Sequence, residues 1–321
     1  MYRSNILAHI ALLLFLALSA PVSAEAAGML VAAVLTGDLP RYRQAHQAFL
    51  KALAQKGYDN SNVEIILQTP NPDPLSWANT IRRFKAIDAD VIVTYGASAT
   101  LAAIREADDI PVVFVDVYGP VETGISRSMI TTGRNLTGIS SKVPLVTLVK
   151  TAQELRPIWK MGVLYSSREA GSLAQLQEMK EIAGQRGFTV VAANATSVAE
   201  VDKAMRSILP KVDCLYVSEC TAGDMGFMKI INMARDSRVP VISQTPDAAE
   251  KGALVSMEIS PAEQGQLAGE YVASILGGKK AAQLRLSIPK KIELIINMRV
   301  AKSLYLDVPL RALNVATRVL K

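Results

Sequence analysis

The chain has 321 residues, half of them hydrophobic and a fifth charged, with a formal net charge of +6. This length suits two domains of ordinary size, and the composition excludes a disordered chain. The basic excess is mild and spread along the chain in pairs such as Lys279-Lys280, so we expect no nucleic-acid partner, which would require a clustered basic face.

The N-terminal segment has the three parts of a secretory signal peptide. Arg3 precedes an apolar run at residues 6–18, and small residues follow as far as Ala24. The alternative is an uncleaved membrane anchor, which needs about 20 apolar residues, and this run is shorter. We therefore expect cleavage after Ala24, which removes residues 1–24. Cleavage after Ala26 is the second choice. The mature protein would reach the periplasm without a lipid anchor, because no cysteine lies near that site.

Strands and helices are predicted to alternate along the rest of the chain. Short apolar runs bounded by turn residues predict strands, and a period of about 3.6 residues predicts helices. In the first half we expect strands at 28–37, 63–68, 90–95, 110–115 and 135–140, with helices at 41–56 and 75–87 and a third after residue 99. In the second half we expect helices at 145–155, 171–186 and 261–276, and strands at 161–166, 189–193, 213–217, 239–243, 253–259 and 293–297. This alternation predicts βαβ units and parallel sheets.

One cassette of residues occurs twice, at 90–115 and again at 213–244. Each copy is an apolar strand ending in small polar residues, then a helical stretch and a second strand. Parallel sheets bind ligands just beyond the carboxyl ends of their strands. Two copies therefore predict two similar lobes, each with a polar rim, arranged as a clamp.

The residues that carry common chemistry are scarce. The mature chain would keep one histidine, His46, which falls in mid-helix and is interpreted as a surface or packing residue. A histidine-dependent triad is therefore disfavoured, and a histidine-rich metal site is excluded. Neither a G-x-x-x-x-G-K-[ST] loop nor a G-x-G-x-x-G motif after the first strand is present. We expect no catalytic residue, no cofactor and no metal ion.

The two cysteines, Cys214 and Cys220, are not expected to form a disulfide. If the segment between them is extended, their Cα atoms lie roughly 20 Å apart, whereas a disulfide needs less than about 7 Å. Cys214 should lie in the core, and Cys220 at a strand end.

The turn Gly96-Ala97-Ser98 is a candidate anion site, because small side chains at a strand-to-helix turn expose backbone N–H groups at the helix N-terminus. The alternative is a tight turn with Ser98 as the helix N-cap. The two interpretations are compatible.

Three further motifs, in this order and spacing, make the chain recognisable: Asn135-Leu-Thr-Gly138, Gly162-Val-Leu-Tyr165 and Gly265-Gln-Leu-Ala268. From about residue 28 to the C-terminus the chain resembles ABC-transporter substrate-binding proteins of the tryptophan/tyrosine type. The resemblance implies the periplasmic-binding-protein type I fold, an α/β fold with two doubly wound parallel-sheet lobes, three crossover segments and a cleft between the lobes. On that pattern residues 28–141 and 254–283 form lobe 1, and residues 142–253 and 284–321 form lobe 2.

The resemblance also places the ligand. A segment like 95–100 contacts the ligand's carboxylate end in that family, and residues 219–222 should face it from the other lobe. Other strand ends point at the same space. The expected ligand-binding residues are Thr36, Tyr95, Gly96, Ala97, Ser98, Asp116, Tyr118, Ser167, Ser172, Glu219, Cys220, Thr221, Gln244 and Glu258. Core packing is the alternative for the apolar members of this set.

The chain departs from the family pattern where an ammonium group would be held. Gly119 stands where an aspartate precedes a proline in the family, Gly171 where an asparagine is usual, and Cys220 where an aspartate follows the strand. These changes predict an altered ligand, with Asp116, Glu219 or Glu258 as substitute carboxylates.

Three functions follow, in order of preference. The first is an exported monomeric receptor that closes on a small organic ligand, such as an amino acid or another small carboxylate or aromatic compound, and delivers it to an ABC permease in the membrane. The second is a periplasmic sensor that presents its closed state to a membrane receptor, a kinase or a cyclase. The third is a secreted enzyme with cleft carboxylates as acid and base, disfavoured by the missing histidines and activated nucleophile.

Overall fold

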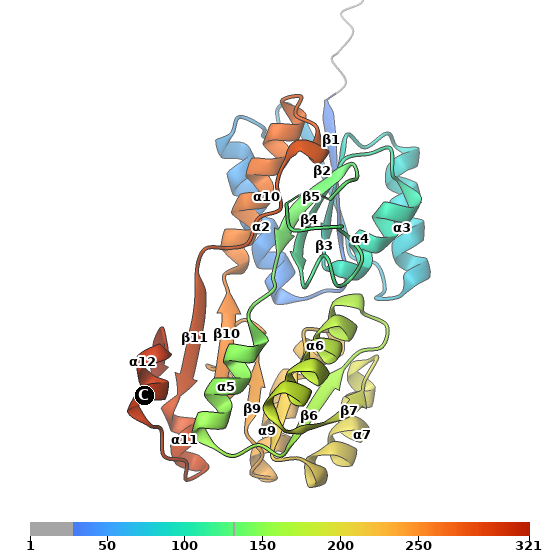
Figure 1. The fold of residues 1–321 in the computed structure, drawn as a ribbon. Coiled ribbons are helices and arrows are strands. Elements are labelled where there is room, and N and C mark those ends of the chain that lie inside the picture. The colour runs from blue at the N-terminus through green and yellow to red at the C-terminus, as the bar shows by residue number, and fades with distance from the viewer. Residues whose placement is uncertain (1–27, 131) are drawn as a thin grey trace, which may run out of the picture.

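The first lobe is built on a five-stranded parallel sheet in the order β2-β1-β3-β4-β5 (Figure 1). A computed structural model describes residues 28–130 and 132–321, so the predicted signal peptide lies outside the described residues. The strands are β1 (Met29–Leu35), β2 (Val63–Gln68), β3 (Val91–Tyr95), β4 (Val112–Val117) and β5 (Leu136–Ser140). The central strands are continuous apolar runs because helices cover both faces of the sheet.

Four helices cover this sheet, two on each face. Successive β1 side chains point to opposite faces: Val31 packs with α2 (Pro40–Gln55) and α10 (Pro261–Leu276), and Ala32 packs with α3 (Pro74–Ala86) and α4 (Ala97–Glu106). Helix α10 comes from far along the sequence and lies directly against α2 (Figure 1).

The second lobe has a seven-stranded sheet in the order β12-β11-β10-β9-β8-β6-β7. Its strands are β6 (Lys160–Tyr165), β7 (Thr189–Asn194), β8 (Cys214–Val217), β9 (Val241–Ser243), β10 (Val255–Ile259), β11 (Ile292–Asn297) and β12 (Arg318–Leu320). One face is covered by α5 (Leu145–Leu155), α6 (Ala170–Arg186), α11 (Met298–Ser303) and α12 (Leu310–Val315). The other is covered by α7 (Val198–Ile208), α8 (Thr221–Met225) and α9 (Phe227–Asp236).

The predicted α/β fold with two sheets is confirmed, and two details differ from expectation. Strand β10, expected to open the return to lobe 1 at residue 254, pairs with β9 and β11 and so belongs to the second sheet. The chain re-enters lobe 1 with α10 and stays there as far as Ser287, which exchanges backbone hydrogen bonds with Gly138 and Ser140. The segment that returns to lobe 1 therefore begins and ends later in the chain than the predicted range 254–283. The sequence did not reveal this, because an apolar strand such as β10 would suit the core of either sheet. In addition, β11 runs antiparallel to β10, so the second sheet is mixed.

The chain passes between the lobes three times: after β5, between β10 and α10, and before β11 (Figure 1). All three passages lie on one side of the boundary, which leaves the carboxyl ends of the central strands facing each other across it. Within the described ranges no helix combines the length and apolar character that crossing a membrane requires.

Candidate functional site

The loops that follow the central strands of both sheets enclose a cavity between the lobes. Its volume is about 20 Å³, close to the space needed by a single water molecule. The polar side chains of the two lobes therefore fit tightly against one another. The lining residues are Thr36, Arg41, Tyr42, Ala97, Ser98, Asp116, Tyr118, Glu169, Gly171, Ser172, Gln175 and Glu219.

The lobe 1 wall contains the predicted strand-to-helix turn. Gly96 is the N-cap of α4 at φ 88°, and a Cβ there would lie 2.4 Å from the Tyr42 hydroxyl. Only glycine fits this backbone and this space. Thr36 closes the turn, because its Oγ1 accepts a hydrogen bond from the N–H of Ala99 at 3.2 Å. The N-terminus of α4, with Ala97 and Ser98, consequently points at the boundary between the lobes.

Arg41, in the first turn of α2, ties the two lobes together. Its Nη1 lies 2.6 Å from Asp224 Oδ2 and 3.7 Å from Glu219 Oε1, both in lobe 2. Its Nε lies 2.9 Å from Asp116 Oδ2 in lobe 1, at ion-pair distance but outside good hydrogen-bond geometry. The guanidinium also lies 4.8 Å from the ring centroid of Tyr42. A single buried cation thus serves carboxylates from both lobes.

Asp116 and Glu169, one on each side of the boundary, are positioned by hydrogen bonds from their own lobes. Asp116 has a φ of 56°, a conformation that costs energy and is often found at functional sites, and it accepts a hydrogen bond from Gln264 of α10. Glu169 is the residue before α6 and accepts hydrogen bonds from the N–H and the hydroxyl of Thr221. Both side chains are buried.

Burial shifts the pKa of three of these carboxyls upward. It raises the pKa of Glu169 to about 7, against hydrogen bonds from Thr221 and the charge of Arg41. The pKa of Glu219 is also raised by burial, with Asp116 and Asp224 adding to the shift and Arg41 and Gln244 opposing it. Burial raises the pKa of Asp224 as well, although Arg41 and Thr245 oppose the shift. One guanidinium does not compensate for the desolvation of this many carboxylates.

The Glu169 pKa predicts that rising pH separates the lobes. A hydrated glutamate releases its proton near its ordinary pKa of 4.5. When the lobes are in contact, burial makes Glu169 keep its proton to higher pH. The arrangement with the lobes in contact therefore binds more protons between about pH 4.5 and 7, and contact weakens as pH rises through that range, by at most about 3 kcal/mol if separation hydrates Glu169 fully. The radius of gyration of the ligand-free protein, measured by X-ray scattering, should increase from about pH 5 to about pH 8. In the Glu169→Gln variant the increase should be smaller; equal profiles would contradict the assignment.

Direct contacts complete the boundary. The Ser98 hydroxyl accepts a hydrogen bond from the N–H of Ala170, at the start of α6, at 3.2 Å. The Tyr118 hydroxyl donates to Glu178 of α6 at 2.8 Å. The predicted residues Ser98 and Tyr118 thus lie between the lobes.

The fourteen predicted site residues fall into three groups: residues that line the cavity, residues that contact the lining from behind, and residues that lie elsewhere. Those that line the cavity are Thr36, Ala97, Ser98, Asp116, Tyr118, Ser172 and Glu219. Gly96, Thr221 and Gln244 contact lining residues from behind: Gly96 borders Thr36, Thr221 bonds Glu169, and Gln244 acts on Glu219.

Four predicted residues lie elsewhere. The Tyr95 hydroxyl is bonded to His46 Nδ1 inside the lobe 1 core, and burial lowers the pKa of that histidine to about 4. Cys220 is buried in the lobe 2 core, where its Sγ accepts a hydrogen bond from Gly223 N, and burial raises the pKa of this thiol. Ser167 bonds Asn194 at the surface, and Glu258 accepts hydrogen bonds from its own neighbourhood, Asp247 N and Ser256 Oγ. A strand end places a side chain near the boundary, but the local turn decides where it points.

Arg41, Glu169 and Asp224 were not predicted. A signal for Arg41 exists, because cations are disfavoured in the first turn of a helix, and α2 has an arginine there with no acidic residue. An arginine at a position that is locally unfavourable for a cation indicates that its side chain has a partner elsewhere in the tertiary structure. Glu169 and Asp224 carry no comparable signal. The cysteines are free, as expected, and both are buried, although only Cys214 was expected in the core.

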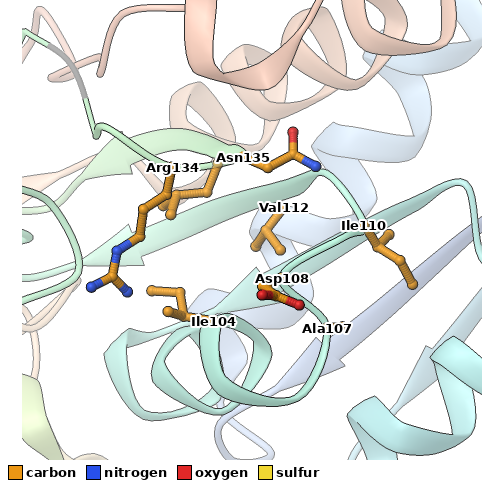
Figure 2. Close-up of a pocket in the computed structure, with 8 residues that line it drawn as sticks. Ile104, Ala107, Asp108, Ile110, Val112, Arg134 and Asn135 are labelled. Atoms are coloured by element: carbon orange, nitrogen blue, oxygen red, sulfur yellow. The ribbon is translucent and has the colours of Figure 1, made fainter.

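A larger cavity, of about 340 Å³, opens on the outer side of lobe 1. Its lining combines apolar side chains such as Ile104 and Val112 with the charged side chains of Arg134 and Asp108 (Figure 2). Lobe 1 alone forms it, so no relative movement of the lobes would close it over a ligand.

One group of carboxylates has spacing suited to a metal ion. Oxygen atoms of Asp247, Glu250 and Glu258 lie within 4.8 Å of one another. Glu250 is paired with Arg318, and Glu258 accepts the hydrogen bonds described above. Two of the three carboxylates, Glu250 and Glu258, therefore already have protein partners.

Comparison with known proteins agrees with this architecture. The "Tyrosine-binding protein" of Clostridioides difficile is 27% identical over 267 residues, which cover 83% of this chain and 77% of that protein. A solved "ABC domain in complex with L-Trp" from Streptococcus pneumonia is 23% identical with a TM-score of 0.84, covering 91% of this chain and all of that one. The ligand-free, open structure of a substrate binding protein with adhesive properties from Clostridium difficile is 25% identical with a TM-score of 0.66, covering 91% of this chain and 99% of that one.

The match to a family model extends over nearly all of the described chain. It runs from residue 30 to residue 320, so both lobes and all three passages between them are included. That family acts outside the cytoplasm and binds small ligands. The chain belongs to the ABC transporter substrate binding protein family.

Proposed function

We propose that this protein captures a small organic molecule with an ammonium group, such as an amino acid, between its lobes and delivers it to an ABC permease. The observation that carries the proposal is the convergence, on one inter-lobe cavity, of a helix N-terminus and carboxylates from both lobes. The N-terminus of α4 suits an anionic group such as a carboxylate. The carboxylates of Asp116, Glu169 and Glu219 suit a cation.

Capture would proceed by closure of the lobes around the three passages. A ligand favours the closed arrangement by contacting both lobes. A comparison of TM-scores supports closure of this kind. At similar sequence identity, the arrangement of the lobes matches the L-Trp complex better than it matches the open, ligand-free relative. The tyrosine and tryptophan in the names of the relatives point to amino acids as the first compounds to test.

Export belongs to the same proposal. Residues 1–24 would direct the chain to the periplasm and be removed, and the monomeric mature protein would meet its permease there. Residues 28–141 with 260–287 would move as one body, and the remainder as the other, because Ser287 is still bonded to lobe 1.

A ligand screen tests the function directly. The thermal unfolding of the mature protein would be followed with amino acids, amines, aromatic acids, nucleosides and peptides. A ligand present at 100 times its Kd should add about 2.7 kcal/mol to the free energy of unfolding. If no small molecule shifts the transition, while the extracytoplasmic domain of a receptor kinase or cyclase does, the transport function is wrong and the sensor function replaces it.

Blocking lobe contact at Gly37 should weaken ligand binding without unfolding either lobe. A Cβ at Gly37 would lie 2.6 Å from Thr221 Oγ1 across the boundary. Gly37→Val should therefore raise the Kd of a ligand found in the screen by about tenfold or more, as measured by calorimetry. The double variant with Thr221→Gly should recover part of the affinity. Unchanged affinity in Gly37→Val would show that binding does not need this contact.

A further inference from the structure

The charges around the inter-lobe cavity do not balance. Among the described residues that line it, three are carboxylates, Asp116, Glu169 and Glu219, and Arg41 is the only cation. A fourth carboxylate, Asp224, pairs with Arg41 from just outside the lining. All five side chains are buried, so water screens charges here little. In the ligand-free protein burial raises the pKa of Glu169 and of Glu219, so these two acids favour protons that a ligand cation would displace.

Arg41 is already committed to two of the four carboxylates. Its short contacts are to Asp224 at 2.6 Å and to Asp116 at 2.9 Å. Lys251 also acts on Asp224, but its ammonium bonds the Pro246 carbonyl and is not part of the lining. Arg41 and Lys251 therefore leave Glu169 without a cation at ion-pair distance, and Glu219 with only the long contact to Arg41.

Glu219 has the weakest partners of the group. Arg41 Nη1 lies 3.7 Å from its Oε1, and Gln175 Nε2 lies 3.4 Å from its Oε2. By contrast, Glu169 accepts the backbone N–H of Thr221 at 2.8 Å. Of the lining carboxylates, Glu219 thus has the most capacity to accept hydrogen bonds from a ligand.

An unpaired amide lies beside Glu219. The Gln244 side chain is 3% exposed, and neither its Oε1 nor its Nε2 has a hydrogen-bond partner among the described residues. Its side chain lies behind the cavity lining, outside good hydrogen-bond geometry with Glu219 but close enough to lower the pKa of that carboxyl. Buried amides without partners are rare and costly. The weakly partnered carboxylate of Glu219, with this amide behind it, suits a ligand group with several N–H donors.

We propose that the ligand is a small organic cation, with more positive than negative charges, and that one of its ammonium or guanidinium groups lies against Glu219. The proposal rests on the proposed function and narrows its ligand class. A zwitterion such as norleucine brings one charge of each sign and leaves the excess of carboxylates unchanged. A basic amino acid or a diamine reduces that excess.

Calorimetry with four matched compounds tests the charge requirement on the mature protein. L-Lysine and L-norleucine share a carbon skeleton and differ in the side-chain ammonium. Cadaverine lacks the carboxylate of lysine, and L-tyrosine represents the aromatic zwitterions. Lysine or cadaverine should bind at least about tenfold more tightly than norleucine and tyrosine, because a charge-assisted hydrogen bond to a buried carboxylate is lost in the zwitterions.

Variants test the placement of the cation. Glu219→Gln keeps the shape of the side chain and should weaken binding of the cationic probe about tenfold or more, with little effect on norleucine. The matched control is Glu181→Gln, an exposed position on α6, which should bind the cationic probe as the unchanged protein does. Equal losses for cationic and zwitterionic probes in Glu219→Gln would overturn the assignment of Glu219.

The outcomes separate the two proposals. If norleucine or tyrosine binds as tightly as lysine and cadaverine, the charge requirement is wrong, while the capture of a small molecule stands. If the four compounds fail and the wider screen finds an anionic or neutral ligand, the same conclusion holds. If the wider screen finds no ligand, the proposed function falls together with this inference.

Discussion

Replacing Arg41 with methionine is expected to separate the lobes of the ligand-free protein. Arg41→Met leaves Asp116, Glu219 and Asp224 buried without their cation, at a cost of about 3–5 kcal/mol when such a pair is broken. Separation lets water reach these carboxylates, so the cost falls on the contact between lobes rather than on the folding of either one. The equilibrium between contact and separation should shift by about a hundredfold or more.

Distances between spin labels would measure this shift. Cysteines introduced at the exposed positions Asn79, on α3, and Lys203, on α7, place one label on each lobe. The native Cys214 and Cys220 are buried and should not react. Arg41→Met should lengthen the distance between the labels. Arg43→Met is the matched control, because Arg43 lies on the same helix and pairs with Asp38 at the surface.

Two results would bear on the role of Arg41. Arg41→Lys keeps the charge but loses the planar fork of donors, so an intermediate distance is expected. If Arg41→Met and the Arg43→Met control give the same label distances as the unchanged protein, the ion pairs do not hold the lobes together.

The second large effect is expected at Gly265, where α10 lies against α2. A Cβ at Gly265 would lie 1.9 Å from the Ala45 carbonyl oxygen, and one at Gly269 would lie 2.7 Å from the Ala52 side chain. Both obstacles belong to a neighbouring helix packed on the sheet, so α10 would have to move away. Gly265→Ala should lower the free energy of unfolding by about 3 kcal/mol, the upper range for overpacking.

Chemical denaturation would measure this loss, with Gly184→Ala as the control. Gly184 is also within a helix, α6, but a Cβ there meets nothing within 4 Å. Gly184→Ala should therefore stabilise the protein by up to about 1 kcal/mol through helix propensity. If both variants were stabilised, the close approach of α10 to α2 would not restrict residue size. Movement of α10 should also displace Gln264, which bonds Asp116 in the cavity wall.

The sequence predicted the strand ends on which the site is built, and the structure shows which of them meet. Thr36, Ser98, Asp116 and Glu219 line the cavity, because parallel strands in both lobes present their carboxyl ends to one boundary. Tyr95 and Cys220 follow the same rule of position, yet they face the cores. Alternation along a strand was not enough to assign them, since buried parallel strands are apolar on both faces.

The amino-acid sequence alone was enough to determine the element order, the two sheets and the two free cysteines. These features depend on the apolar period, the turn residues and the spacing within short segments of the chain. The position of β10, the pairing of Arg41 with carboxylates from both lobes, and the unpaired amide of Gln244 were decided only by the tertiary structure. These features depend on contacts between residues far apart in the chain. Desolvation and charge pairing across the boundary arise only when the lobes meet, and no short segment of sequence contains both partners.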